Sequence, residues 1–101
     1  MVEFAATGSK IYFNGRIVPE HEATVHVLSG AVKYGATVFE GICAYLGDED
    51  RLTVFRLPEH LLRLQDSMRI MRFEHDWSVS HLTEVVTGLN TCQRMSHVFN
   101  R

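Results

Sequence analysis

The sequence predicts an α+β domain in which helices pack on one side of an antiparallel sheet. Three observations favour this class: an Asn-Gly pair between two short β-rich runs, a second pair of β-rich runs within residues 37–57, and an apolar pattern of helical period after Pro58. The β-rich runs come first and the helical patterns follow. This order is typical of α+β folds and not of parallel sheets with alternating strands and helices.

Length and composition are those of one globular domain. The chain has 101 residues, 46% hydrophobic and 22% charged, with a formal net charge of −2. Its ten Lys and Arg residues form no basic stripe, which argues against nucleic-acid binding. No apolar run approaches the roughly 20 residues that span a bilayer, and the first ten residues lack the features of a signal peptide. We therefore expect a cytoplasmic protein that does not enter membranes, with Cys43 and Cys92 as free thiols.

The first predicted element is a β-hairpin over residues 11–18. Asn14 and Gly15 separate the runs Ile-Tyr-Phe and Arg-Ile-Val, and an Asn-Gly pair supplies the two positive φ angles of a type I′ turn. Pro19 ends the second strand because it cannot donate a hydrogen bond to the ladder.

A further strand and a second hairpin follow. Residues 23–29 are β-rich and predict a short strand, and residues 30–36, with two glycines, fit either one helical turn or a loop. Residues 37–45 predict a strand, the acidic stretch 46–50 a turn, and 51–57 the returning strand.

The strand predicted at 37–45 carries a glutamate and a glycine at its centre. Because side chains alternate between the faces of a strand, Glu40 lies on one face, and Phe39, Gly41 and Cys43 lie on the other. A buried glutamate needs hydrogen-bond partners or a raised pKa, and the sequence does not indicate a partner. The gap at Gly41 fits either a small ligand or the close approach of a helix or bulge, and both interpretations stay open.

Two helices complete the predicted fold. Pro58 fits the first turn of a helix over 58–72, and Ser80 can cap a second helix that Gly88 weakens near its end. The apolar stripe of the first helix is formed by Leu57, Leu61, Leu64, Met68 and Met71. The shared face of the second is formed by Leu82, Val85, Val86 and Leu89. Residues 90–101 show no helical periodicity.

Residue patterns of the common catalytic and metal sites do not occur in the sequence. The six histidines lack zinc spacing, since His21 and His26 are five residues apart, and we find no nucleophile elbow, P-loop or dinucleotide-binding motif. We expect the two lysines, Lys10 and Lys33, at the surface, and a reactive Lys33 beside Tyr34 is the less favoured alternative. We assign no catalytic residue and no metal ligand.

Three longer motifs occur in order. They are the Asn-Gly hairpin in IYFNGRIVPE, then HVLS…YG…VFEGI, then FRLPEHLLRL. Over roughly residues 10–88 they resemble the N-terminal part of the branched-chain amino acid aminotransferases, a class IV family of transaminases. The resemblance implies the small N-terminal domain of the fold type IV enzymes over residues 10–89, with pyridoxal 5′-phosphate as cofactor. It also implies a homodimer that transfers the amino group of Leu, Ile or Val to 2-oxoglutarate.

The resemblance implies roles for five residues. Arg63, in HLLRL, matches the arginine that binds the cofactor phosphate in the family. Phe39, in VFEG, matches an aromatic residue of the substrate side-chain pocket, with Gly41 and Cys43 on the same wall. Tyr34 matches a tyrosine that reaches the partner subunit's active site.

The sequence also departs from the family. Cys43 stands where many members have Arg or Lys, and Lys33 stands where a histidine is usual. Neither lysine matches the catalytic lysine, which lies in the second domain of the family. We expect residues 1–9 to be a flexible N-terminus and 90–101 an atypical tail, produced by a truncation, a frameshift or a cut fragment. The chain alone is therefore expected to be inactive.

Two alternatives remain open, of which only the second belongs to another class of function. One is another class IV enzyme, such as D-amino-acid transaminase or aminodeoxychorismate lyase, although VFEGI favours the branched-chain branch. The other is a non-catalytic remnant that dimerises or binds a partner through exposed apolar surface.

Overall fold

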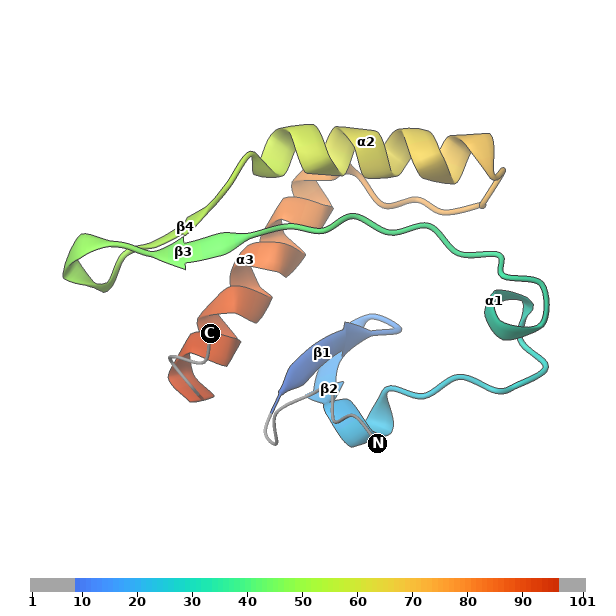
Figure 1. Ribbon diagram of the computed structural model, residues 1–101, viewed down its shortest axis with the longest axis horizontal. Helices are drawn as coiled ribbons and strands as arrows, with labels where there is room; N and C mark the ends of the chain where they lie inside the picture. The colour runs from blue at the N-terminus through green and yellow to red at the C-terminus, as the bar shows by residue number, and fades with distance from the viewer. Residues whose placement is uncertain (1–8, 97–101) are drawn as a thin grey trace.

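The computed structural model of the chain describes the backbone of residues 9–96, with side chains for 9–49 and 51–90. The expected flexibility of the N-terminus therefore falls almost entirely outside the described residues, as does the last part of the expected tail. The elements, in chain order, are β1 (Lys10–Phe13), β2 (Arg16–Pro19), η1 (Glu20–Glu22), α1 (Gly30–Lys33), β3 (Ala44–Leu46), η2 (Asp48–Asp50), β4 (Leu52–Val54), α2 (Leu57–Ile70) and α3 (Val79–Ser96) (Figure 1).

The predicted α+β class is confirmed, but the strands form two sheets and not one. β1 pairs with β2 and β3 pairs with β4, each pair antiparallel. Helix α3 contacts both α2 and β1, so it connects α2 to the first hairpin (Figure 1). The second hairpin extends away from these elements beyond the start of α2 (Figure 1).

The first hairpin is confirmed in both place and turn. Phe13 pairs with Arg16 at its end, and Asn14 and Gly15 have φ angles of 52° and 88°. These are the two positive values that a type I′ turn requires, and Asn-Gly adopts them at little cost. Pro19 is the last residue of β2, as predicted.

The prediction of a strand at residues 23–29 is wrong. These residues form no strand, and the segment ends in a turn before α1, where the Ser29 hydroxyl accepts a hydrogen bond from the Val32 backbone N–H at 3.4 Å. Val25 and Val27 are exposed, at 59% and 67%. β-rich residues form a strand only where a neighbouring strand offers a ladder, and within residues 9–96 no strand pairs with this segment. Of the two interpretations of 30–36, the helical turn is present at Gly30–Lys33.

The strand predicted at 37–45 is shorter than expected. It is paired only towards its end, where β3 meets β4 and the Phe55 N–H donates to the Cys43 carbonyl at 2.8 Å. Residues 36–43 are extended without a ladder partner and run alongside α2 (Figure 1). The predicted return strand at 51–57 is likewise reduced to β4, because Arg56 turns into the left-handed region with a φ of 52° and α2 begins at Leu57.

The first predicted helix is confirmed as α2, and its stripe forms much of the core. Leu57, Leu61 and Met68 are buried together with Val18 of β2. Met71, which was expected in the stripe, lies just beyond the helix and is 43% exposed. The four residues of the shared α3 face, which are Leu82, Val85, Val86 and Leu89, are half-buried.

The second predicted helix is confirmed, but its ends differ from the prediction. The Ser78 hydroxyl accepts a hydrogen bond from the His81 backbone N–H at 3.0 Å, so Ser78, and not Ser80, caps α3. The helix passes Gly88 and continues to Ser96, into residues 90–101, in which the sequence shows no helical periodicity. Backbone hydrogen bonding carries the helix through a stretch that has no apolar period.

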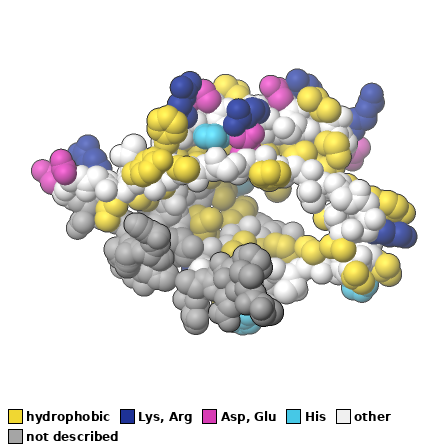
Figure 2. Space-filling view, in the orientation of Figure 1, with side chains coloured by type: hydrophobic (Ala, Val, Ile, Leu, Met, Phe, Trp, Pro, Cys, Tyr) yellow, Lys and Arg dark blue, Asp and Glu magenta, His cyan; other side chains and the backbone are white. Residues whose placement is uncertain are grey.

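The chain exposes more surface than a compact protein of its size. Its accessible surface is 7970 Å², whereas a folded monomer of 11.5 kDa exposes about 5800 Å². Its radius of gyration is 14.9 Å, against about 13 Å for a compact chain of this length. Figure 2 shows hydrophobic side chains gathered around a hollow in one face. No helix in the described part of the chain is both long enough and apolar enough to cross a membrane.

Candidate functional site

The extended residues 36–43 keep the alternation of a strand, and this places two different surfaces beside α2. Val38, Glu40 and Ile42 are half-buried, whereas Phe39, Gly41 and Cys43 are exposed. The two faces predicted from the sequence are therefore confirmed, although no neighbouring strand holds the segment.

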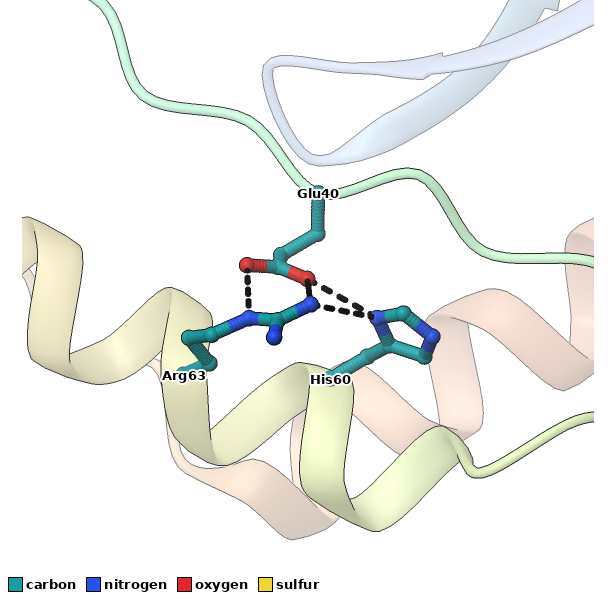
Figure 3. Close-up of polar contacts among 3 residues, drawn as sticks. All are labelled: Glu40, His60 and Arg63. Atoms are coloured by element: carbon teal, nitrogen blue, oxygen red, sulfur yellow. Dashed lines mark hydrogen bonds and ion pairs between the residues drawn. The ribbon is translucent and has the colours of Figure 1, made fainter.

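Glu40 meets two side chains of α2. The Arg63 Nε–H donates to Glu40 Oε2 at 2.8 Å, and Arg63 Nη2 donates to Oε1 at 2.7 Å (Figure 3). The Nδ1 atom of His60 lies 2.8 Å from the same Oε1. The Glu40 side chain is 8% exposed and that of His60 18%, whereas that of Arg63 is 67% exposed. The carboxylate is thus almost enclosed, and the guanidinium covers it from the solvent side.

These contacts fix the protonation of the cluster. The hydrogen bonds from Arg63 and then from His60 lower the pKa of Glu40 to about 2, so the carboxylate is charged at neutral pH. The hydrogen bonding between Arg63 and Glu40, together with the opposite charge of Glu40, raises the pKa of Arg63. A charged carboxylate only accepts hydrogen bonds, so His60 carries a proton on Nδ1 and donates it to Glu40. The 3.5 Å contact between Arg63 Nη2 and His60 Nδ1 is then a contact between two donors.

The helical spacing of α2 brings His60 and Arg63 together. They lie three residues apart, so they are neighbours on one face, outside the buried stripe of Leu57, Leu61 and Met68. The sequence analysis identified Glu40 as anomalous and Arg63 as the match to a family arginine but did not connect them, and it missed His60. The His-x-x-Arg spacing in a predicted helix was the available signal.

The opposite face of the extended segment is open. Phe39 is 86% exposed, and a Cβ atom built at Gly41 would meet nothing within 4 Å. The alternative that Gly41 accommodates a helix or bulge of this chain therefore finds no support among the described residues. A hydrogen bond with the Cys43 side chain raises the pKa of Tyr45, and both residues are exposed.

The predicted site residues are not all brought together. Phe39, Gly41 and Cys43 share one face, whereas Arg63 binds Glu40 on the other side of the segment. Tyr34 follows α1 and is 75% exposed, with Lys33 Nζ lying 5.3 Å from its ring centroid. Within the described residues, no group of three or more His, Cys, Asp or Glu side chains is placed to hold a metal ion.

The chain is similar to proteins named branched-chain-amino-acid aminotransferase. One from Salmonella typhimurium is 46% identical over 74 residues, which are 73% of this chain and 24% of the relative. One from Pseudomonas aeruginosa is 38% identical over 74 residues, with the same shares of 73% and 24%. The chain thus spans about a quarter of the length of the curated relatives that it matches. No family model matches the chain.

A solved structure gives the same result for the fold. The crystal structure of the Escherichia coli branched-chain amino acid aminotransferase superimposes with a TM-score of 0.71 and 44% sequence identity. The match covers 77% of this chain and 25% of that one. The sequence match and the structural match therefore cover similar shares of this chain and of its relatives.

Proposed function

This chain belongs to the branched-chain-amino-acid aminotransferase family, matching the N-terminal portion of its members, and on that premise we propose that it forms the small N-terminal domain of a pyridoxal-phosphate-dependent transaminase. The observation that carries the proposal is 46% sequence identity together with a TM-score of 0.71 on similar shares of the chain. The reaction of the whole enzyme is then transfer of the amino group of Leu, Ile or Val to 2-oxoglutarate.

Arg63 is the residue proposed to hold the cofactor phosphate. A guanidinium has five N–H groups, and two of them donate to Glu40, which leaves three for an anion. The side chain is 67% exposed, and a phosphate monoester offers several oxygens that accept charge-assisted hydrogen bonds. The residues present therefore fit the phosphate end of pyridoxal 5′-phosphate. When bound, this cofactor supplies an electron sink at the substrate carbon that carries the amino group.

The exposed face of Phe39, Gly41 and Cys43 is proposed as one wall of the substrate side-chain pocket. Branched aliphatic side chains are bound by apolar contact, and this face combines an aromatic ring, an open glycine and a small thiol. Tyr34, which projects from the chain at 75% exposure, is proposed to reach the partner subunit of a homodimer. We also propose that the protein is cytoplasmic.

We propose that the 101-residue chain alone does not transaminate. Its two lysines are Lys10 and Lys33, and neither matches the catalytic lysine position of the family. Arg63 is proposed to hold the phosphate end of the cofactor, but no lysine of the chain matches the amine that meets its reactive end. The purified chain with pyridoxal 5′-phosphate, leucine and 2-oxoglutarate is therefore expected to produce no glutamate, and measurable turnover would overturn this part of the proposal.

A chimera tests the function itself. The matched residues of this chain replace their counterparts in the Escherichia coli relative, and amino transfer to 2-oxoglutarate is measured with Leu, Ile and Val. We expect the chimera to be active and the Arg63→Gln substitution to reduce its activity greatly. Added pyridoxal 5′-phosphate should partly restore the activity of the Arg63→Gln variant. A chimera that folds but neither binds pyridoxal 5′-phosphate nor transfers amino groups would contradict the proposal. A preference for D-alanine as the amino donor would favour the D-amino-acid transaminase alternative.

The exposed apolar surface favours a second candidate function, an interaction module. Phe39 at 86%, Ile70 at 74% and Leu28 at 69% exposure are large side chains without cover. A surface of this kind promotes association, either with a second copy or with an intact relative. Sedimentation of the chain alone, and with the Escherichia coli enzyme, distinguishes these cases from a monomeric domain.

A further inference from the structure

We propose that Glu40 is a positioning residue for Arg63: it occupies the side edge of the guanidinium, at Nε and Nη2, and so presents the end edge, at Nη1 and Nη2, to a phosphate monoester. The inference rests on the proposed function for the identity of the anion. The contact itself is a property of this chain, and it assigns a role to the glutamate that the sequence marked as anomalous.

The shape of the guanidinium makes the two edges interdependent. The group is planar, and its N–H donors point in fixed directions. Nε and one Nη2 hydrogen bind the two Glu40 oxygens at 2.8 and 2.7 Å. The second Nη2 hydrogen and one Nη1 hydrogen lie along the adjacent edge, where two oxygens of a phosphate can accept them, and the other Nη1 hydrogen points to the Cδ side. Fixing one edge therefore fixes the direction of the other.

The surroundings of Glu40 make it a firm support. Its side chain is only 8% exposed, and His60 Nδ1 holds Oε1 from a second direction at 2.8 Å (Figure 3). Two donors from successive turns of α2 thus restrict rotation of the carboxylate. The Arg63 side chain, by contrast, is 67% exposed, so solvent reaches most of it, although His60 Nδ1 lies 3.5 Å from Nη2.

Charge and orientation predict opposite effects when Glu40 is neutralised. The carboxylate cancels the positive charge of Arg63, so a purely electrostatic view predicts tighter phosphate binding in Glu40→Gln. The positioning role predicts weaker binding, because a long side chain must then be ordered at the moment of association. Whether Glu40→Gln strengthens or weakens phosphate binding therefore decides between the electrostatic view and the positioning role.

The test uses the full 101-residue chain and two probes, inorganic phosphate and pyridoxine 5′-phosphate, whose alcohol cannot react with lysines. Affinities are measured by NMR for the wild type, Glu40→Gln and Arg63→Gln. We expect Glu40→Gln to weaken binding by roughly three- to tenfold, the effect of leaving one long side chain unordered before binding. Unchanged or tighter binding in Glu40→Gln, with binding lost in Arg63→Gln, would overturn the positioning role alone. Equal binding in Arg63→Gln would overturn the phosphate role of Arg63, and this inference with it.

Asp66→Asn is the matched control. Asp66 pairs with Arg69 on the same helix, Nη1 to Oδ1 at 2.9 Å, and both side chains are exposed. This variant removes one negative charge from an arginine partner without touching Glu40. We expect it to leave phosphate affinity unchanged or slightly increased, and a loss equal to that of Glu40→Gln would overturn the inference.

A measurement on the wild type keeps the inference falsifiable if the Glu40 variant does not fold. The Arg63 Nε–H resonance reports the hydrogen bond to Glu40. As phosphate is added, we expect this resonance to keep its position and its protection from solvent exchange, while the Nη resonances move. Movement of Nε–H to the position of a free arginine would show phosphate displacing Glu40 from the same edge and would overturn the inference.

Discussion

The Glu40 carboxylate and the Arg63 guanidinium join the extended segment to helix α2 through hydrogen bonds of 2.8 and 2.7 Å, although 23 residues separate them in the chain. The segment has no ladder partner where Glu40 lies, so side-chain contacts must fix its position there. The same pair thus contributes to the fold and determines which edge of the arginine remains available. The binding role proposed for Arg63 therefore involves an ion pair that also joins two parts of the fold.

The first prediction concerns acid. The pKa of Glu40 in the folded chain is about 2, below its ordinary value of 4.5. A carboxyl whose pKa is lowered by folding stabilises the fold above its unfolded-state pKa, and the contribution is lost as the pH falls through the folded-state value. We expect the free energy of unfolding to decrease between about pH 4.5 and pH 2, and Glu40→Gln to remove part of that decrease. Urea denaturation in pH steps measures it.

The control for this prediction is again Asp66→Asn. Its ion pair with Arg69 is exposed on both sides, and such pairs contribute little to stability. This variant should therefore keep the acid dependence of the wild type. An identical pH dependence in wild type and Glu40→Gln would show that the contact with Arg63 does not stabilise the folded chain.

The second prediction tests the small core. Leu61 is 1% exposed, and its deletion to alanine leaves a cavity that costs about 2–5 kcal/mol. The neighbouring Leu62 is 57% exposed, so Leu62→Ala should change stability by less than about 0.5 kcal/mol. Circular dichroism during urea denaturation compares the two variants. Equal effects would mean that α2 does not bury the stripe that its spacing predicts.

The sequence was sufficient where structure is set by neighbouring residues. Asn14-Gly15 determines the first hairpin, and the stripe from Leu57 to Met68 determines α2, because turn geometry and helical period act over a few residues. It was insufficient where a distant partner decides. Residues 23–29 have strand composition but no adjoining strand, and Glu40 was recognised as anomalous without its partners. Alternation of faces in 36–43 was nevertheless predicted, because it depends only on an extended backbone.

The site shows the same division. The exposure of Phe39 and the open space at Gly41 show that the described residues leave the proposed pocket wall uncovered. That Arg63 lies on the opposite side of the segment, with Glu40, could not be inferred from the sequence. It depends on how α2 is rotated against residues 36–43, which is set by the burial of Leu57, Leu61 and Met68.

The third prediction separates two glycines. Gly41 has open space at its Cβ position, so Gly41→Ala should leave the chain as stable as the wild type or up to about 1 kcal/mol more stable. Gly35 also has space but has a φ of +67°, and alanine there should cost about 1–2 kcal/mol. Thermal denaturation compares them. In the chimera with the Escherichia coli relative, Gly41→Ala should raise KM for leucine while the fold is kept. An unchanged KM would remove Gly41 from the proposed pocket wall.

The last prediction concerns the start of α3, where the structure corrected the sequence. The Ser78 hydroxyl accepts the His81 backbone N–H at 3.0 Å, and an N-cap of this kind contributes about 1 kcal/mol, so Ser78→Ala should destabilise the chain by that amount. Ser80 lies inside the first turn of the helix and is exposed, so Ser80→Ala should be neutral or slightly stabilising because alanine is the better helix former. Urea denaturation of both variants measures the difference. The reverse order of effects would place the cap at Ser80 and move the start of α3 two residues along the chain, away from Val79.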